Sequence, residues 1–558
     1  MSDPEIPSKR ERTLSVLLVN NLIVSALVFA LLEIWRPFYF LTDDNLGGCF
    51  PLLSGMGHRL AEGKSPFVAD YIFGGNYDLL RDCSLSCWHP VYLLASLLAN
   101  TPAHFLMVDL VAFIFLMTAT AGFVNLAHFL RQELALQLSD ARLMLYALSF
   151  NYSMIVLTTG SSWIGFLGNH SALPWLALGI LQTSWRRGLC LVTFFSLHHI
   201  LGGHIAPTIS DSIFLSLFAV GISIYRRSFL PLISWVSGYA IALLILSPFL
   251  IPAWHGFLMS DRSDGLTVAT MSKFAVPAML FPFSYFFSTF SVLLFPHYQF
   301  GTTQLFYSSA FVSCAAAWAI IPAAMSRKRW RFLEILCLGL LALLAVMIVR
   351  PLWVSSIMLH LPLLKSMRWP FREILQFQFF LHLFLVMRPL GGSARFQRLA
   401  IFAGVFIFVF PLIFLNAPTF LPMQPDRELL FSGKADLYWN RVKPLLKPDD
   451  CVAVIADINM IDAHPFEIPY TLLEVYNFPI LAKTKNVSGY SVTVPRDQLY
   501  VKIVPVLHMG IFGPEQKAAL LKERPDVKFI TLESVKPLRI TLSSRDGPVT
   551  DLKPFVAP

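Results

Sequence analysis

Long apolar runs recur along the chain up to about residue 416, with short polar segments between them. A helix of about 20 apolar residues crosses the ~30 Å hydrocarbon core of a bilayer. The pattern therefore predicts a polytopic α-helical membrane protein. About eleven spans are expected, over residues 14–36, 104–126, 143–160, 166–184, 188–207, 210–225, 229–251, 303–324, 332–349, 371–388 and 399–416.

Two further apolar stretches do not fit a simple span. Residues 89–100 are too short to cross a bilayer, and we expect an interfacial helix lying along the outer leaflet there. Residues 274–296 are interrupted by Pro277, Pro282 and Pro296, and an interfacial or a re-entrant segment is expected.

The composition changes at about residue 417, where charged residues become frequent again. The short apolar runs 451–460 and 527–535 are typical of strands, and 514–525 is typical of a short helix. Residues 417–558 are therefore predicted to form a soluble α/β or α+β domain.

Basic residues indicate how the chain is oriented. If the N-terminal residues 1–13 are cytoplasmic, every segment predicted on the inner side carries at least two basic residues, as the positive-inside rule requires. These residues are Lys9, Arg10, Arg12, Arg131, Arg142, Arg186, Arg187, Arg226, Arg227, Arg327, Lys328, Arg329, Arg331, Arg388, Arg395 and Arg398. The transmembrane domain then covers 14–416, with a large first outer loop at 37–103, and the 417–558 domain is extracytoplasmic.

The overall charge and the cysteines change this picture little. Only 14% of residues are charged, against about 25% in soluble domains. The net charge of +9 follows the inner loops rather than one soluble face, which argues against nucleic-acid binding. Cys49, Cys83 and Cys87 share the first outer loop, where one disulfide is an option in an oxidising compartment. Their spacing completes no zinc pattern.

Polar residues at membrane depth are costly and therefore point to function. They gather towards the outer side in the predicted topology: Asp43 and Asp44 after the first span, Asn169 and His170 in the fourth, His198, His199 and His204 in the fifth, and Arg368 and Arg372 around the start of the tenth. An acid and arginines at this level suit transfer of a sugar from a polyprenyl phosphate. The carboxylate would act as general base on an acceptor hydroxyl, and the guanidinium groups would hold the departing phosphate.

Several short motifs on the outer side resemble the GT-C class of membrane glycosyltransferases, and its bacterial YfhO-like branch in particular. The quoted stretches are FLTDDNLGGCFPLL (40–53), SPFVADYIFGGNYDLLRDCSLSCWHPVYLLASLL (65–98), Asn169-His170 with ALPWL (172–176), Gly202-Gly203-His204 and SMRWPFR (366–372). The resemblance covers about residues 14–416. It departs at Val68-Ala69-Asp70, where the family often has a tryptophan.

The resemblance implies a lipid-linked sugar donor and a catalytic acid in the first outer loop. If the roles of the family are transferred to the matching positions, Asp43 or Asp44 would be the base. Arg368 and Arg372 would then bind the lipid phosphate of the donor. The cavity would be lined by Asp70, Asn169, His170 and His204. The expected partners are a polyprenyl-phosphate-sugar donor, membrane lipids and an envelope glycan or lipid acceptor, in a bacterial inner membrane.

Alternatives stay open at this point. A divalent metal ion is an optional cofactor, since Asp43, Asp44 and Asp70 could supply oxygen ligands. Two other functions compete with the transferase: a transporter or flippase of lipid-linked saccharide, and a non-catalytic envelope assembly protein with the same fold. A transporter would need functional polar groups on both faces and at the midplane, and the sequence pattern does not reveal them.

Overall fold

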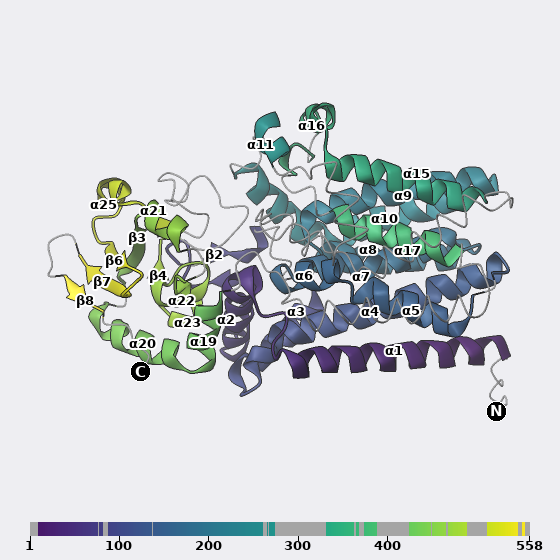
Figure 1. The fold of residues 1–558 in the computed structure, drawn as a ribbon. Coiled ribbons are helices and arrows are strands. Elements are labelled where there is room, and N and C mark those ends of the chain that lie inside the picture. The colour runs from purple at the N-terminus through teal and green to yellow at the C-terminus, as the bar shows by residue number, and fades with distance from the viewer. Residues whose placement is uncertain are drawn as a thin grey trace.

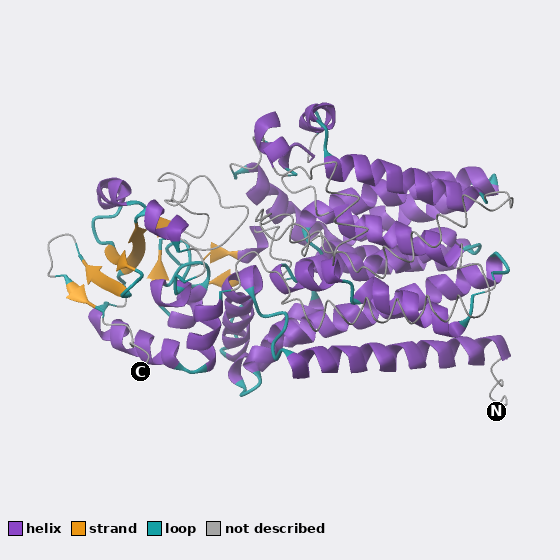
Figure 2. Ribbon diagram, viewed as in Figure 1, coloured by secondary structure: helices purple, strands orange, loops and turns teal. Residues whose placement is uncertain are grey.

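The computed structural model describes residues 9–75, 77–81, 88–136, 138–260, 265, 267–273, 331–361, 364–367, 373–387, 423–447, 449–464, 467–487, 511–544 and 549–552. Within these residues, a bundle of long helices adjoins a smaller C-terminal region that contains a β-sheet (Figures 1 and 2).

The bundle is built from helices that run roughly along one axis (Figure 1). They are α1 (Lys9–Trp35), α4 (Met107–Glu133), α5 (Asp140–Asn151), α6 (Met154–Ser162), α7 (Gly165–Leu181), α8 (Trp185–Gly202), α9 (Ile205–Arg226), α10 (Leu230–Leu258), α15 (Phe332–Val349) and α17 (Ile374–Met387). Helix α7 is buried along almost its whole length, between α4 and α8. Helices α1 and α10 expose many apolar side chains, as expected of lipid-facing helices.

Five helices of the described residues are long and apolar enough to cross a membrane: Leu14–Trp35, His104–Glu133, Ile205–Arg226, Leu230–Leu258 and Phe332–Val349. They correspond to five of the predicted spans. Helices α7, α8 and α17 also overlap predicted spans. The spans expected at 303–324 and 399–416, and the segment 274–296, lie outside the described residues.

The single span predicted over 143–160 is instead two helices, α5 and α6. The break falls at Tyr152 and Ser153, whose hydroxyl groups bond to other helices. Tyr152 donates to the backbone oxygen of Ser25 at 2.7 Å, and Ser153 donates to Gln378 Oε1 at 2.9 Å. These contacts satisfy polar groups inside the bundle, and apolar content along the sequence does not reveal them.

The first loop folds into short elements at the end of the bundle where α1 ends. A π-helix (Asn45–Cys49) continues into α2 (Phe50–Ala61), and β1 (Val68–Ala69) pairs with β2 (Tyr77–Asp78) in an antiparallel ribbon. Helix α3 (Pro90–Ser96) and the 3₁₀ turn Leu97–Asn100 occupy the stretch predicted as an interfacial helix. Two short helices, α11 (Val268–Lys273) and α16 (Leu352–Leu359), pack on each other.

The C-terminal region begins with α19 (Gln424–Phe431) and α20 (Lys434–Val442). Its sheet contains β3 (Cys451–Ala456), β4 (Lys485–Asn486), β5 (Ile511–Phe512), β6 (Lys528–Ser534), β7 (Arg539–Ser543) and β8 (Thr550–Asp551). Strand β3 is parallel to β4, β5 and β6, while β6–β7 and β7–β8 are antiparallel. The short helices are α21 (Ile458–Ala463), α22 (Tyr470–Leu473), α23 (Phe478–Ala482) and α25 (Lys517–Glu523).

The sheet agrees with the strands expected at 451–460 and 527–535. Every residue of β3 is buried, as is typical of a strand with parallel neighbours on both sides. The first of these predicted runs is longer than the strand, because Asp457 accepts a hydrogen bond from the Asn459 N–H and caps α21.

The C-terminal region packs against one end of the bundle, which we call the capped end. It is the end where α1 finishes and α4 begins, and the N-terminus lies at the opposite, open end (Figure 1). The loops between helices at the open end bond to one another. Arg226 donates to the Gln182 carbonyl at 3.2 Å, and Arg331 donates to the Leu134 carbonyl at 3.0 Å. Basic residues thus gather at the open end.

Candidate functional site

Hydrogen bonds hold the acidic segment after α1 against the turn between α6 and α7. Asn45 Nδ2 donates to the carbonyl oxygens of Gly160 and Ser161, at 2.7 and 2.9 Å. Asn45 Oδ1 accepts the backbone N–H of Ile164 at 2.8 Å. Thr42 Oγ1 also donates to the Ser161 carbonyl, at 2.9 Å. These bonds fix the residues on both sides of Asp43 and Asp44.

Two membrane-embedded acids hold the turn that leads into this segment. Glu33 accepts the N–H of Phe38 at 2.8 Å, and Asp109 accepts the N–H of Phe40 at 3.0 Å. The local pattern of the sequence did not single out these two acids.

Asp43 and Asp44 are adjacent, but their side chains have different surroundings. Asp43 is 3% exposed and has a left-handed backbone, with φ at 50°. A non-glycine residue in this conformation carries strain that the surrounding contacts must offset. Burial raises the pKa of Tyr470 in α22, and the negative charges of Asp426 and Asp43 raise it further. Asp43 therefore lies close to the C-terminal region.

Asp44 faces the bundle instead. It is half-buried, and its Oδ2 accepts the indole N–H of Trp163 at 2.5 Å. Trp163 lies between α6 and α7, at the corner that anchors Asn45. The two acids thus lie at one junction but contact different parts of the molecule.

The C-terminal region covers the π-helix that follows these acids. Asn477 donates its backbone N–H to the Gly47 carbonyl at 2.9 Å and its side-chain amide to the Gly48 carbonyl at 3.1 Å. A Cβ atom on Gly47 would lie 2.9 Å from Cγ of Tyr476. The backbones approach this closely because position 47 has no side chain.

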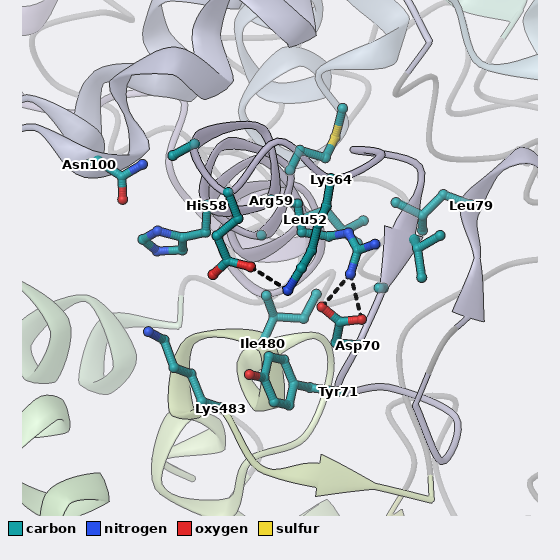
Figure 3. A pocket seen from close by; sticks show the side chains of 16 residues that line it. Leu52, His58, Arg59, Lys64, Asp70, Tyr71, Leu79, Asn100, Ile480 and Lys483 are labelled. Atoms are coloured by element: carbon teal, nitrogen blue, oxygen red, sulfur yellow. Dashed lines mark hydrogen bonds and ion pairs between the residues drawn. The ribbon is translucent and has the colours of Figure 1, made fainter.

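Asp70 lines a separate pocket of about 320 Å³ between the first loop and α23 (Figure 3). Its two carboxylate oxygens each lie 2.6 Å from Nη1 of Arg59. Lys64 pairs with Glu62 at 2.7 Å on the same wall. Lys483 enters from α23 (Figure 3). Neither of the two predicted bases is among the described residues that line this pocket.

Asn169 and His204, predicted to line a cavity, together close a tight helix junction. Asn169 Oδ1 accepts the His204 N–H at 2.7 Å, and its Nδ2 donates to Thr208 Oγ1 at 2.8 Å. His204 caps the start of α9 through its own ring. A Cβ on Gly168 would lie 2.1 Å from the Gly202 carbonyl oxygen, so the backbones of α7 and α8 nearly touch. The contacts of Asn169 and His204 hold α7, α8 and α9 together.

His170 belongs to a buried polar layer inside the bundle. Its Nε2 lies 3.3 Å from Asn151 Oδ1, and its ring stacks on Phe150 with centroids 4.0 Å apart. Asn151 donates to Thr120 Oγ1 at 2.6 Å, and Thr120 lies 3.0 Å from the hydroxyl of Ser25. Ser25 and Thr120 lie near the middle of the spans Leu14–Trp35 and His104–Glu133. The sequence pattern did not reveal these polar groups near the middle of the spans.

His198, which also stood out in the sequence, belongs to a second series of hydrogen-bonded polar side chains. Its Nδ1 lies 2.9 Å from His89 Nε2, and its Nε2 lies 2.6 Å from the hydroxyl of Ser171. Its neighbour His199 pairs with Asp211 at 2.8 Å. Both histidines thus have polar partners on neighbouring elements.

Arg368 and Arg372 lie outside the described residues, but the residues next to them are placed. Arg350 Nη1 donates to the Met367 carbonyl at 2.8 Å. Its Nη2 lies 3.7 Å from Oε1 of Glu373, and both side chains are fully buried. Arg350 thus holds the chain on either side of the predicted phosphate-binding segment, and the local sequence pattern gave no sign of this contact.

The optional metal site is not supported by the described residues. They contain no group of three or more His, Cys, Asp or Glu side chains placed to hold a metal ion. Asp43, Asp44 and Asp70 are all described and do not form such a group. Cys49 is a free thiol whose pKa burial raises to about 12. The cysteines at 83 and 87 lie outside the described residues.

Comparisons with known proteins give no assignment for this chain. No family model matches the sequence, and no curated protein or solved structure is similar to it.

Proposed function

We propose that the chain is a membrane glycosyltransferase with a GT-C-like transmembrane domain. It would move a sugar from a polyprenyl-phosphate carrier to an envelope glycan or lipid. The observation that carries the proposal is Asp43, a carboxylate that is 3% exposed and held in a strained backbone where the bundle meets the C-terminal region. Strained, buried acids of this kind concentrate at functional sites.

The chemistry follows from a carboxylate in a water-poor junction. The acceptor hydroxyl oxygen would attack the anomeric carbon while the bond from that carbon to the phosphate oxygen breaks. The hydroxyl proton would pass to Asp43, and the electron pair of the broken bond would leave with the phosphate. Direct displacement inverts the anomeric centre. Asp44 is the alternative base, but its bond to Trp163 favours a positioning role.

The membrane orientation follows from charge. Basic residues gather in the loops of the open end, so the positive-inside rule makes that end cytoplasmic. The capped end and the C-terminal region would then be extracytoplasmic. In a bacterium this corresponds to the inner membrane, where polyprenyl-phosphate sugars are presented on the outer leaflet.

The test compares Asp43→Asn and Asp44→Asn in the full-length protein. Membranes that contain each variant are supplied with a panel of radiolabelled polyprenyl-phosphate sugars, and the release of polyprenyl phosphate is measured. The Asp43 variant should lose at least about 100-fold in rate, the contribution typical of a general base. Asp140→Asn is the matched control, since Asp140 pairs with Arg131 at the open end.

Two results would remove the base hypothesis. One is normal transfer by both single variants and the double variant. The other is an equal loss in the Asp140 control, which would indicate a general defect. Folding of each variant is checked by its elution profile in detergent.

The buried polar layer favours a second candidate, a transporter or flippase of lipid-linked saccharide. His170, Asn151, Thr120 and Ser25 supply polar groups at mid-membrane depth, as transport sites require. Proteoliposomes with a fluorescent short-chain polyprenyl-phosphate saccharide separate the two functions. A flippase would move the probe between leaflets even in the Asp43→Asn variant, and a transferase would not. A non-catalytic assembly protein would do neither.

A further inference from the structure

A groove of about 840 Å³ opens where the end of α1 meets the C-terminal region. One wall consists of Trp35, Arg36 and Pro37, directly after the membrane-spanning part of α1. The other is formed mainly by α19 and the start of α20, which lie beside this end of α1 (Figure 1). The groove therefore lies at the level where a bilayer changes from hydrocarbon to headgroups.

Three cations are among the described residues that line the groove. They are Arg36, Arg427 of α19 and Lys434 of α20. Arg427 is 8% exposed, and its Nη2 donates to the Pro37 carbonyl at 2.9 Å, which fixes the guanidinium against the opposite wall. Burial lowers the pKa of Arg427, and the charge of Arg36 lowers it further. The two arginines thus repel each other, and an anion placed between them would relieve that repulsion.

The acids that line the groove do not neutralise all of its positive charge. Glu467 lines the groove but pairs with Lys536 at 2.7 Å, and Glu428 is exposed and accepts a bond from Gln424 at 3.1 Å. The Glu33 and Asp109 pair lies within electrostatic reach of Arg427. Neither Glu33 nor Asp109 is among the described residues that line the groove itself.

An apolar stripe on α1 leads directly to the groove. Leu27, Leu31 and Ile34 are more than half exposed along the half of α1 nearest the groove, and Trp35 is also exposed at its end. Tryptophan at this position is typical of the membrane interface. About eight residues of helix cover 12 Å, close to the depth of one leaflet.

We propose that this groove binds the headgroup phosphate of an anionic phospholipid from the surrounding bilayer. Arg36 and Lys434 contact the phosphate, Arg427 holds the wall in place, and one acyl chain lies along Leu27, Leu31 and Ile34. The three cations at the end of this exposed apolar face, which continues through Ile23 and Val19 to Val16, fit the phosphate and acyl chain of a phospholipid. The site is independent of the proposed transfer reaction.

The test uses the full-length protein, purified in a nonionic detergent and examined by native mass spectrometry. The probes are phosphatidylglycerol, diacylglycerol, inorganic phosphate and a polyprenyl monophosphate. We expect the wild type to retain phosphatidylglycerol and to release diacylglycerol, which lacks the phosphate. The double variant Arg36→Gln/Lys434→Gln should bind phosphatidylglycerol about 10-fold more weakly, since each interfacial cation contributes substantially to anionic-lipid binding.

A matched control makes the same change in net charge at positions outside the groove. Lys447→Gln/Lys522→Gln removes two exposed lysines of the C-terminal region, away from the groove, and should bind like the wild type. Arg427 is left unchanged because its bond to Pro37 also supports the fold. The thermal midpoint of each variant in detergent confirms that it is folded.

Three results would overturn the proposal. Equal retention of phosphatidylglycerol by the groove variant and the wild type would exclude the groove as its site. Binding of inorganic phosphate as tight as that of the lipid would exclude a lipid ligand. Binding of the polyprenyl monophosphate at least 10-fold tighter than that of phosphatidylglycerol would assign the groove to the carrier lipid instead.

Discussion

Trp163 donates its indole N–H to Asp44 across 2.5 Å, and this bond joins positions 119 residues apart in the chain. Asp44 belongs to the first loop, whereas Trp163 ends the short helix α6. The bond orients one acid of the pair towards the bundle, while its neighbour Asp43 lies near Tyr470. The arrangement gives the two acids different tasks and suggests a direct test.

Replacing Trp163 with phenylalanine removes the donor but keeps most of the ring. A hydrogen bond to a charged group contributes about 1.5–3 kcal/mol, so the variant should be destabilised by that order. The measurement is thermal unfolding in detergent. Trp185→Phe is the control, because Trp185 is exposed and its replacement should leave the midpoint unchanged. Equal midpoints for the two variants would contradict the role of this bond.

Gly47 should be the most sensitive position in the contact between the first loop and the C-terminal region. In Gly47→Ala the new Cβ would lie 2.9 Å from Tyr476 Cγ and 3.2 Å from Met423 Cε. Overpacking of this kind costs about 1–3 kcal/mol. The region should then detach more often, and limited proteolysis should release it faster.

Gly339→Ala provides the matched control for this substitution. Gly339 lies within α15 and has no neighbouring atom within 4 Å of an added Cβ. Alanine in an open helical position is neutral or slightly stabilising. Identical proteolysis of Gly47→Ala and Gly339→Ala would show that the contact tolerates the extra methyl group.

Two buried acids should make the stability of the C-terminal region depend on pH. Burial raises the pKa of Asp426 and of Glu474 to about 7. In the unfolded chain such groups ionise near pH 4. As the pH rises, the folded protein therefore holds the protons of Asp426 and Glu474 to a higher pH than the unfolded chain does. The difference in proton binding stabilises the folded state. This contribution to the free energy of unfolding is complete below about pH 4 and is lost as the pH rises to about 7. We expect the thermal midpoint to fall over this range.

Asp426→Asn separates this effect from other titrations. The amide oxygen can still accept the Thr471 N–H, which lies 2.5 Å from the Asp426 carboxylate, but the side chain no longer ionises. The midpoint of this variant should fall less steeply between pH 4 and 7. Asp436→Asn changes an exposed acid of α20 and should keep the wild-type slope. An unchanged slope in Asp426→Asn would contradict the assignment.

The proposed orientation can be tested with single cysteines in a cysteine-free chain. Ser432 is exposed at the capped end, and Glu133 is exposed at the open end of α4. In spheroplasts, a membrane-impermeant maleimide should label Ser432→Cys at once and Glu133→Cys only after lysis. The opposite order of labelling would reverse the orientation and place the Asp43 junction in the cytoplasm.

The sequence by itself determined the elements whose signals are local. A long apolar run makes a helix at membrane depth, because only a helix satisfies its backbone there, and α9, α10 and α15 lie close to their predicted ranges. The strands at 451–460 and 527–535 were equally visible, because short apolar runs between turn residues mark buried strands. Asp43 and Asp44 could be selected because charge next to a span is rare.

Only the tertiary structure decided which residues meet. The hydrogen bonds from Phe40 to Asp109, from Tyr152 to Ser25 and from Arg427 to Pro37 join residues far apart in the chain. Nothing in the local pattern of apolar and polar residues encodes such partners, because they depend on how helices pack around one another. For the same reason Asp70, predicted to line a cavity with Asn169, His170 and His204, lies in a pocket whose described lining contains none of those three.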